Sequence, residues 1–305
     1  MALAIQWIEK KHSCLEWSNF LYVHSVFTVV ASGYAKLSKF KMYRQLRKLM
    51  TTSKLLKHRN EKDKFFQSFE VSCKEPEDFD EVAEFVYKYY TKNNPLGQIF
   101  SVPEYELYFH DTKRVQADLE HSCTLGCHCR QNGKLVGIAF GSVRHIRGTD
   151  LPQLAINSLS RTASPQLRAK IKFDAWMRRD IFEELKAEKI FMMGLGAVHP
   201  KFLGRKIMEH LSEPLECLAI KNQCQFSVVL ATSKFTQDIN KRNPRYNLLR
   251  EVAYKDYVDP DTGEKPLLSL SKIHTHAQLY YRCLNSNLIE NWSCWVKGSC
   301  DLRYF

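Results

Sequence analysis

The sequence predicts an α/β (α+β) protein built on one mixed β-sheet with a single βα crossover in its middle. Predicted strands and helices alternate in the order β-α-α-β-β-α-β-α-β-α-β-β, which is not the regular alternation of a doubly wound fold. An Asn-Gly dipeptide at 132–133 joins two strand-like stretches and indicates a β-hairpin. An apolar run at 190–198 is followed by a short basic turn and an amphipathic helix, which is the pattern of a βα unit.

Each element of this order has its own signal. Apolar or alternating residues predict strands at 66–71, 121–131, 134–143, 190–198, 225–231, 248–257 and 277–284. Helical spacing and helix-start signals predict helices at 76–92, 103–119, 165–188, 207–219 and 233–242. Pro76 and Pro165 suit first turns of helices, whereas Pro214 lies inside one, where it can produce a kink.

Charge divides the chain into three regions. Of the formal net charge of +12, residues 1–68 contribute 13 Lys/Arg minus 4 Asp/Glu, or +9. We therefore predict a basic extension at 1–65, a folded domain at 66–285 and a C-terminal tail at 286–305. The domain carries too little positive charge for a nucleic-acid binder.

The extension includes a predicted basic amphipathic helix at 34–59. Such a helix can contact an anionic membrane or an acidic partner, or resemble an organelle-targeting segment. We favour a poorly ordered extension or a helix laid on the surface of the domain, because solvation explains a charged helical face. Membrane contact is thus not the expected role.

The ten cysteines are scattered, and the start of the chain does not have the charge order of a secretory signal. We expect free thiols in a reducing compartment and a cytoplasmic protein. His121, Cys127 and Cys129 share one side of a predicted strand, but their spacing lacks a second ligand pair. Buried thiols are the favoured interpretation, and no metal is predicted.

The βα unit at 189–211 is the candidate binding element. Gly194 and Gly196 interrupt its strand, and glycine in a strand marks a bulge or a close approach of the backbone to another group. The basic connection 199–206 contains Gly204 and leads into the helix. Such a turn directs backbone N–H groups and a helix dipole toward a phosphate, although an ordinary crossover would have the same pattern.

The order of elements resembles the GNAT superfamily of N-acetyltransferases over residues 66–285, and within it the arylalkylamine N-acetyltransferase-like branch of insects and nematodes. Three stretches carry the resemblance: FVYKYYTKNNPLGQI at 85–99, VHPKFLGRKIMEHL at 198–211, and YKDYVDPDTGEKP…HTHAQLYY at 254–281. The resemblance implies a twisted, mostly antiparallel sheet with helices on both faces. It also implies that the fourth and fifth strands separate to admit acetyl-CoA.

The resemblance assigns the binding of acetyl-CoA, a co-substrate, to one strand and the loop after it. The strand backbone at Gly196, Ala197 and Val198 would pair with the pantetheine arm, and a backbone N–H near the bulge would hold the reaction's oxyanion. The pyrophosphate would contact the loop residues Lys201, Phe202, Leu203, Gly204, Arg205 and Lys206. The family motif Arg/Gln-x-x-Gly-x-Gly/Ala fits from Lys201 or from Leu203, and in both registers Lys206 replaces a small residue.

The implied proton-transfer positions are also substituted. Asn94 occupies the position of the family's proposed glutamate base, and an amide cannot accept a proton at neutral pH. Phe235 stands where related enzymes place a tyrosine that protonates the thiolate, leaving Ser233 and Thr236 as nearby hydroxyls. The alternative bases are His274 and His276, with Glu104 and His110 as weaker candidates.

The resulting prediction is an acetyl-CoA-dependent N-acetyltransferase that acts on a small primary amine of the arylalkylamine type. Aromatic residues near the presumed acceptor entrance suit an arylalkyl group or the core equally well: Phe85, Tyr89, Tyr90 and Phe100. The alternative is a catalytically weak or inactive member of the fold that serves as a binding or regulatory module. No nucleic-acid partner is expected.

Overall fold

The computed structural model describes residues 64–120, 123–146, 163–266, 272–284 and 296–297. Contacts divide the chain into a unit at 1–63 and a unit at 64–305, and all that follows concerns the second. The predicted extension helix at 34–59 lies outside the described residues. No helix in the described ranges is long and apolar enough to cross a membrane.

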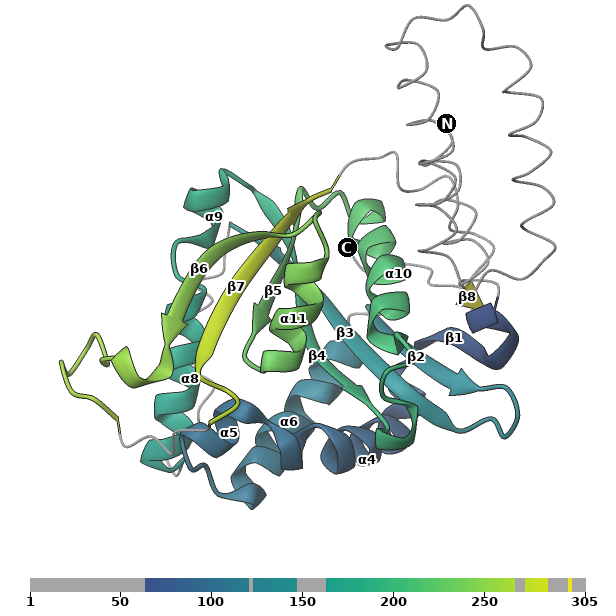
Figure 1. Ribbon diagram of the computed structural model, residues 1–305, viewed down its shortest axis with the longest axis horizontal. Coiled ribbons are helices and arrows are strands. Elements are labelled where there is room, and N and C mark those ends of the chain that lie inside the picture. Colours follow the sequence, from purple (N-terminus) through teal and green to yellow (C-terminus); the bar gives the residue numbers. More distant parts are fainter. Residues whose placement is uncertain (1–63, 121–122, 147–162, 267–271, 285–295, 298–305) are drawn as a thin grey trace, which may run out of the picture. The chain divides into compact units, whose positions relative to one another are not determined.

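An eight-stranded sheet forms the centre of the domain, in the order β6-β7-β5-β4-β3-β2-β1-β8 (Figure 1). Only β4–β5 and β1–β8 pair in parallel, so the predicted mixed, mostly antiparallel sheet is confirmed. The strands are β1 (Phe69–Lys74), β2 (Thr124–Cys129), β3 (Leu135–His145), β4 (Lys189–Val198), β5 (Phe226–Ala231), β6 (Asn247–Ala253), β7 (His276–Cys283) and β8 (Val296–Lys297).

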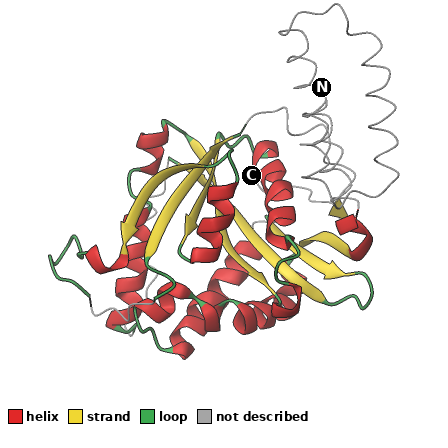
Figure 2. Cartoon of the chain, in the orientation of Figure 1, coloured by secondary structure: helices red, strands yellow, loops and turns green. Residues whose placement is uncertain are grey.

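Helices cover both faces of this sheet (Figure 2). They are α4 (Phe79–Tyr89), α5 (Pro95–Ile99), α6 (Glu104–Glu120), α8 (Pro165–Met177), α9 (Ile181–Leu185), α10 (Ile207–Lys221) and α11 (Lys234–Arg242). The strand residues of β4 alternate between two cores: Ile190 and Met192 pack with α8, whereas Phe191 packs with α10. A third cluster joins α4 and α6 to β3 and β4. The period-2 pattern of a strand thus explains how one strand joins both layers.

The predicted hairpin is confirmed, with Gly133 at φ 67° in its turn. Cys127 and Cys129 are buried on β2, and burial raises the pKa of Cys127 to about 12. His121 lies outside the described residues. Among those residues, no three His, Cys, Asp or Glu side chains are grouped to hold a metal ion.

Three predicted elements differ from the structure. The helix predicted at 165–188 is two helices, because Asp180 adopts a left-handed φ of 57° between α8 and α9. The strand predicted at 248–257 ends at Ala253, where the 3₁₀ turn Tyr254–Asp256 begins. Residues 64–68 are helical, so Phe66 precedes strand β1 rather than leading it.

The expectation of free thiols throughout needs correction. Cys73 is disulfide-bonded, although the other described cysteines are free. A disulfide is uncommon in a reducing compartment, so it weakens the reasoning that led to a cytoplasmic location. In the predicted tail, which had no recognisable pattern, β8 adds a short parallel strand to the edge of the sheet beside β1.

Candidate active site

The central feature of the site is the separation of β4 from β5. Their last parallel pair is Met193–Val229, after which Leu230 pairs only with β7. Beyond this point β4 continues to Val198 while pairing with β3 alone, so the edge of β4 that faces β5 has no strand partner among the described residues. Figure 1 shows the two strands diverging toward their C-terminal ends.

A β-bulge lies at the start of this unpaired edge. Ala139 pairs with Gly196 and Gly141 pairs with Met193, so β4 has two residues, Gly194 and Leu195, opposite one residue of β3. The bulge turns both residues toward the α6–α8 face. Gly194 is exposed, and a Cβ atom there would lie 2.6 Å from the Nη2 atom of Arg114. The backbone at the bulge is thus accessible and lies next to a cation.

The predicted acetyl-CoA strand residues lie on the same unpaired edge. Gly196, Ala197 and Val198 pair with β3 on one side, which leaves their other side available. A Cβ atom at Gly196 would lie 2.4 Å from the Cε atom of Met208 in α10. Glycine at this position therefore allows α10 to lie close to the strand.

The loop after β4 leads directly to the N-terminus of α10. Its first part is a 3₁₀ turn, Pro200–Phe202, capped by His199, whose Nδ1 accepts a hydrogen bond from the N–H of Lys201. Gly204 and Lys206 adopt left-handed φ values of 77° and 58°. The side chain of Lys206 does not cap α10, and the first-turn N–H groups of a helix have no acceptor within it.

The left-handed φ of Lys206 bears on the two motif registers. This conformation strongly favours glycine. The register starting at Leu203 has glycine at position 206, and the register starting at Lys201 has glycine or alanine there, so the backbone of Lys206 is compatible with both registers. Lys201, Arg205 and Lys206 add positive charge to the loop, while Leu203 is 66% exposed. Basic side chains beside uncapped helix N–H groups form an environment that fits a phosphate.

Asn94, which the resemblance assigns to the position of the family's glutamate base, has a structural role. It is the N-cap of α5, and its Oδ1 accepts a hydrogen bond from the N–H of Gly97 at 3.1 Å. The side chain is only 2% exposed, and its Nδ2 has no hydrogen-bond partner. An N-cap needs an acceptor, which explains why an amide oxygen is suitable here.

The other predicted proton-transfer residues gather at the N-terminus of α11. Ser233 is its N-cap and bonds both the N–H and the hydroxyl of Thr236. His274 accepts a hydrogen bond from the N–H of Lys234, and Phe235 is 68% exposed. His276 lies at the start of β7, bonded to Thr275. Ser233, Thr236 and His274 therefore come together, but they stabilise the start of a helix.

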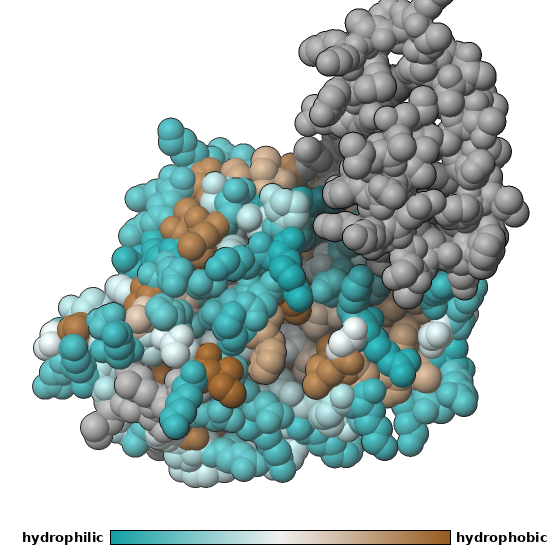
Figure 3. All heavy atoms as spheres, in the orientation of Figure 1, coloured by the Kyte–Doolittle hydropathy of each residue, from teal (hydrophilic) through white to brown (hydrophobic). Residues whose placement is uncertain are grey.

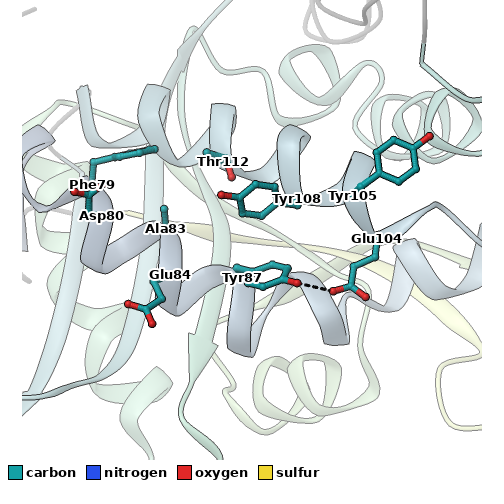
Figure 4. A pocket seen from close by; sticks show the side chains of 9 residues that line it. All are labelled: Phe79, Asp80, Ala83, Glu84, Tyr87, Glu104, Tyr105, Tyr108 and Thr112. Atoms are coloured by element: carbon teal, nitrogen blue, oxygen red, sulfur yellow. Dashed lines mark hydrogen bonds between the residues drawn. The ribbon is translucent and has the colours of Figure 1, made fainter.

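Glu104 and His110 lie on different sides of α6. Glu104 accepts a hydrogen bond from Tyr87 at the end of a surface groove between α4 and α6, where Tyr105, Tyr108 and Glu84 also lie (Figure 4). The inward faces of these two helices pack on the sheet, so the groove lies on their outer side. His110 instead contacts the buried Asp111.

Two polar groups near the separation of β4 and β5 were not predicted from the sequence. The hydroxyl of Tyr246 donates to Glu216 at 2.6 Å and lies 3.2 Å from the Sδ atom of Met193. Glu216 also pairs with the buried Arg282 of β7. Burial raises the pKa of Tyr246. Tyr246 lies in a segment predicted to be a loop, so nothing in the sequence indicated that it would contact Glu216 and Met193.

The second group is a set of charged residues at helical spacing on α6 and α8. On α6 it comprises Asp111, Arg114 and Asp118, and on α8 it comprises Lys170, Asp174 and the C-cap residue Arg178. We call these residues the charged cluster. Spacings of three and four residues indicate that the charged residues of each helix share one face. The sequence does not show, however, that the two helices are neighbours.

The surface over α10 and α11 is mostly hydrophilic, with apolar side chains in separate patches (Figure 3). Exposed apolar side chains in the described part include Leu203 of the loop, Phe235 of α11 and Ile273 before β7. Phe235 contacts the ring of His274. Apolar groups thus accompany the basic loop and the helix start.

Comparison with known proteins identifies the fold. No protein-family model and no curated protein sequence matches the chain. Solved structures do match. A mosquito arylalkylamine N-acetyltransferase-like 5b has a TM-score of 0.62 at 15% identity, covering 71% of this chain and 100% of that chain. The Drosophila melanogaster polyamine N-acetyltransferase, which forms N-acetylagmatine, has the same scores and coverage. Arylalkylamine N-acetyltransferase 2 from Aedes aegypti has a TM-score of 0.60 at 18% identity, covering 71% and 99%.

These matches and the separated strands define the class: the chain has the fold of the GNAT N-acetyltransferases. The resemblance predicted from the sequence is therefore confirmed at the level of the fold. The similar structures include a mosquito protein and an Aedes aegypti protein that are described as arylalkylamine N-acetyltransferases or like them.

Proposed function

We propose that this protein transfers an acetyl group from acetyl-CoA to a small primary amine. The observation that carries the proposal is the unpaired edge of β4 beyond Met193, which runs from an accessible bulge to a basic loop at the N-terminus of α10. One continuous backbone path thereby offers a strand edge and helix N–H groups to one extended ligand.

The residues present fit acetyl-CoA in three respects. The free edge at 196–198 can accept an amide-containing arm as an added strand. Loop residues Lys201, Phe202, Leu203, Gly204, Arg205 and Lys206 would surround the pyrophosphate, with positive charge supplied by the basic ones. A backbone N–H at the bulge would hold the oxyanion that forms when the amine attacks the thioester.

A second candidate function is a binding or regulatory module without efficient catalysis. The observation that favours it is that Asn94, Ser233 and His274 each cap a helix or bond its first N–H groups. None of these groups is therefore available as a proton-transfer residue without loss of a structural contact. Loss of a general base typically costs a factor of about 10²–10⁴ in rate, which weakens catalysis without preventing the attack of an amine.

Calorimetric titration with acetyl-CoA tests the proposal, followed by assays of thiol release with tryptamine, dopamine and a panel of polyamines. Binding together with acceptor-dependent thiol release supports the transferase. Binding without release with any acceptor supports the module. No heat with millimolar acetyl-CoA overturns the proposal. Gly196→Val is a useful negative control, because its side chain would meet Met208 beside the binding edge.

A further inference from the structure

The charged cluster lies beside the bulge of β4. The Nη2 atom of Arg114 lies against Gly194, and Arg114 pairs with Asp118 at 3.4 Å on the next turn of α6. Across from it, Asp174 of α8 pairs with Arg178. The two helices lie side by side, because Leu107 of α6 packs with Leu167 and Ile171 of α8 and Glu106 accepts a hydrogen bond from Ser164 at the start of α8. Burial lowers the pKa of Lys170, and the nearby charges of Asp174, Asp111, Arg114 and Arg178 also act on it.

These side chains remain accessible to solvent although they lie between two helices and the sheet. The side chains of Arg114, Asp174 and Arg178 are 30%, 25% and 19% exposed, and Gly194 is exposed beneath them. A core would exclude water from all of them. The charged cluster is therefore partly open to solvent beside the bulge, where the acyl group of the proposed co-substrate would lie.

The cations in and beside the charged cluster exceed the anions. Lys170, Arg114, Arg178 and the neighbouring Arg144 of β3 face Asp111, Asp118 and Asp174, so that four positive charges face three negative charges. Burial lowers the pKa of the adjacent His110, which keeps this ring neutral near pH 7. One positive charge is thus not compensated.

Two cationic donors in the charged cluster lack partners. Lys170 is only 5% exposed, and its ammonium makes no hydrogen bond or ion pair in the described part of the chain. The Nε of Arg178 is buried without an acceptor. Asp111, which lies near Lys170, instead bonds Thr91 and His110. A buried cationic donor without an acceptor, such as the Nε of Arg178, is costly unless a ligand supplies the acceptor.

We propose that the acceptor amine carries a carboxylate, as amino acids do, and that Lys170 and Arg178 bind this carboxylate. This inference rests on the proposed function, because it names the substrate class of the same site. The amine nitrogen forms a bond to the thioester carbon as the carbon–sulfur bond breaks. The nitrogen loses one proton and the sulfur gains one, so the reaction needs no other reactant.

The test uses pairs of acceptors that differ only in the carboxylate: tyrosine and tyramine, tryptophan and tryptamine, arginine and agmatine. We expect kcat/KM for the carboxylate member of at least one pair to be about tenfold higher or more, the usual effect of one charged hydrogen bond. Lys170→Met should remove this preference, mainly by raising KM for the amino acid. The decarboxylated member should lose much less, because it has no carboxylate for Lys170 to bind.

Lys172→Met is the matched control on the same helix. Lys172 pairs with Asp259 and Asp261 and does not belong to the charged cluster, so the preference should remain. Thermal unfolding of both variants shows whether they are folded. A preference for the amines in every pair overturns the inference, as does an equal effect of Lys170→Met on both members of the preferred pair.

Failure of the inference and failure of the proposed function give different results. If acetyl-CoA does not bind, the proposed function fails, and amino-acid binding to the protein alone is then measured by calorimetry. If acetyl-CoA binds without turnover, the same titration is made on its complex. In both cases, the inference is supported if the amino acid binds, its amine does not, and Lys170→Met abolishes the binding of the amino acid. The absence of this difference overturns it.

Discussion

Substitution of Asn94 tests directly whether a carboxylate at this position acts as the general base of the proposed reaction. Its side chain is 2% exposed and caps α5 through Gly97, and the resemblance places a glutamate base at this position. Asn94→Glu restores a carboxylate but moves it one methylene further along the side chain. We predict that this variant is more active and less stable than the native protein.

The stability cost follows from two local changes. Losing the cap costs about 1 kcal/mol, and fitting an extra methylene into a buried site costs about 1–3 kcal/mol. The expected total is therefore about 2–4 kcal/mol in the free energy of unfolding measured with urea. Asn94→Gln should lose a similar amount, because it has the same length and also withdraws the capping oxygen.

The comparison of Glu with Gln at this position isolates the base. A general base contributes a factor of about 10²–10⁴, so kcat/KM of Asn94→Glu should exceed that of Asn94→Gln by about a hundredfold near pH 8. The assay is thiol release with the acceptor of highest turnover. A ratio close to one would refute the assignment of Asn94 to the base position, whatever the stability of the two variants.

Three other predictions concern the local structure. At φ 58° glycine avoids a strain of about 1 kcal/mol, so Lys206→Gly should be more stable to urea than Lys206→Ala; the opposite order would contradict the left-handed conformation. A Cβ atom at Gly141 would lie 2.0 Å from Cζ of the buried Phe191. Gly141→Ala should therefore cost about 1–3 kcal/mol, and Phe191→Leu in the same chain should recover part of that loss; strictly additive costs would show that the ring is not the cause. Burial lowers the pKa of His110, so its contribution to stability is full above about pH 6.5 and is lost as the pH falls toward the lowered value. His110→Gln should make the fall in stability between pH 6.5 and 5.5 shallower, by at most about 1.4 kcal/mol per pH unit; an unchanged slope would mean that His110 titrates normally.

The fold was largely predictable because its main elements have strong local signals. The Asn-Gly turn, the apolar run of β4 and the capped starts of α8 and α11 each define an element without tertiary information. The errors occur where local patterns do not determine the backbone. Asp180 takes a left-handed φ inside a continuous apolar pattern, and β8 pairs with β1, which is far from it in the sequence.

The site was predictable where it depends on the backbone and not where it depends on contacts between distant helices. The glycines of β4 and the basic loop were found because bulges and turns select residue types. Ser233 and Thr236 were placed correctly near each other, but sequence does not distinguish a catalytic hydroxyl from an N-cap. The charged cluster was missed because about sixty residues separate Asp111 from Lys170.

The proposed anchoring of a carboxylate offsets part of the loss caused by the substituted base. One charged hydrogen bond to the acceptor is worth about tenfold in kcat/KM, whereas a general base contributes a factor of about 10²–10⁴. An acceptor held by Lys170 and Arg178 would therefore recover less than is lost with Asn94, and turnover would also depend on the intrinsic reactivity of the amine. The choice between transferase and module depends as well on Lys206, because the resemblance places the pyrophosphate beside the backbone of this residue.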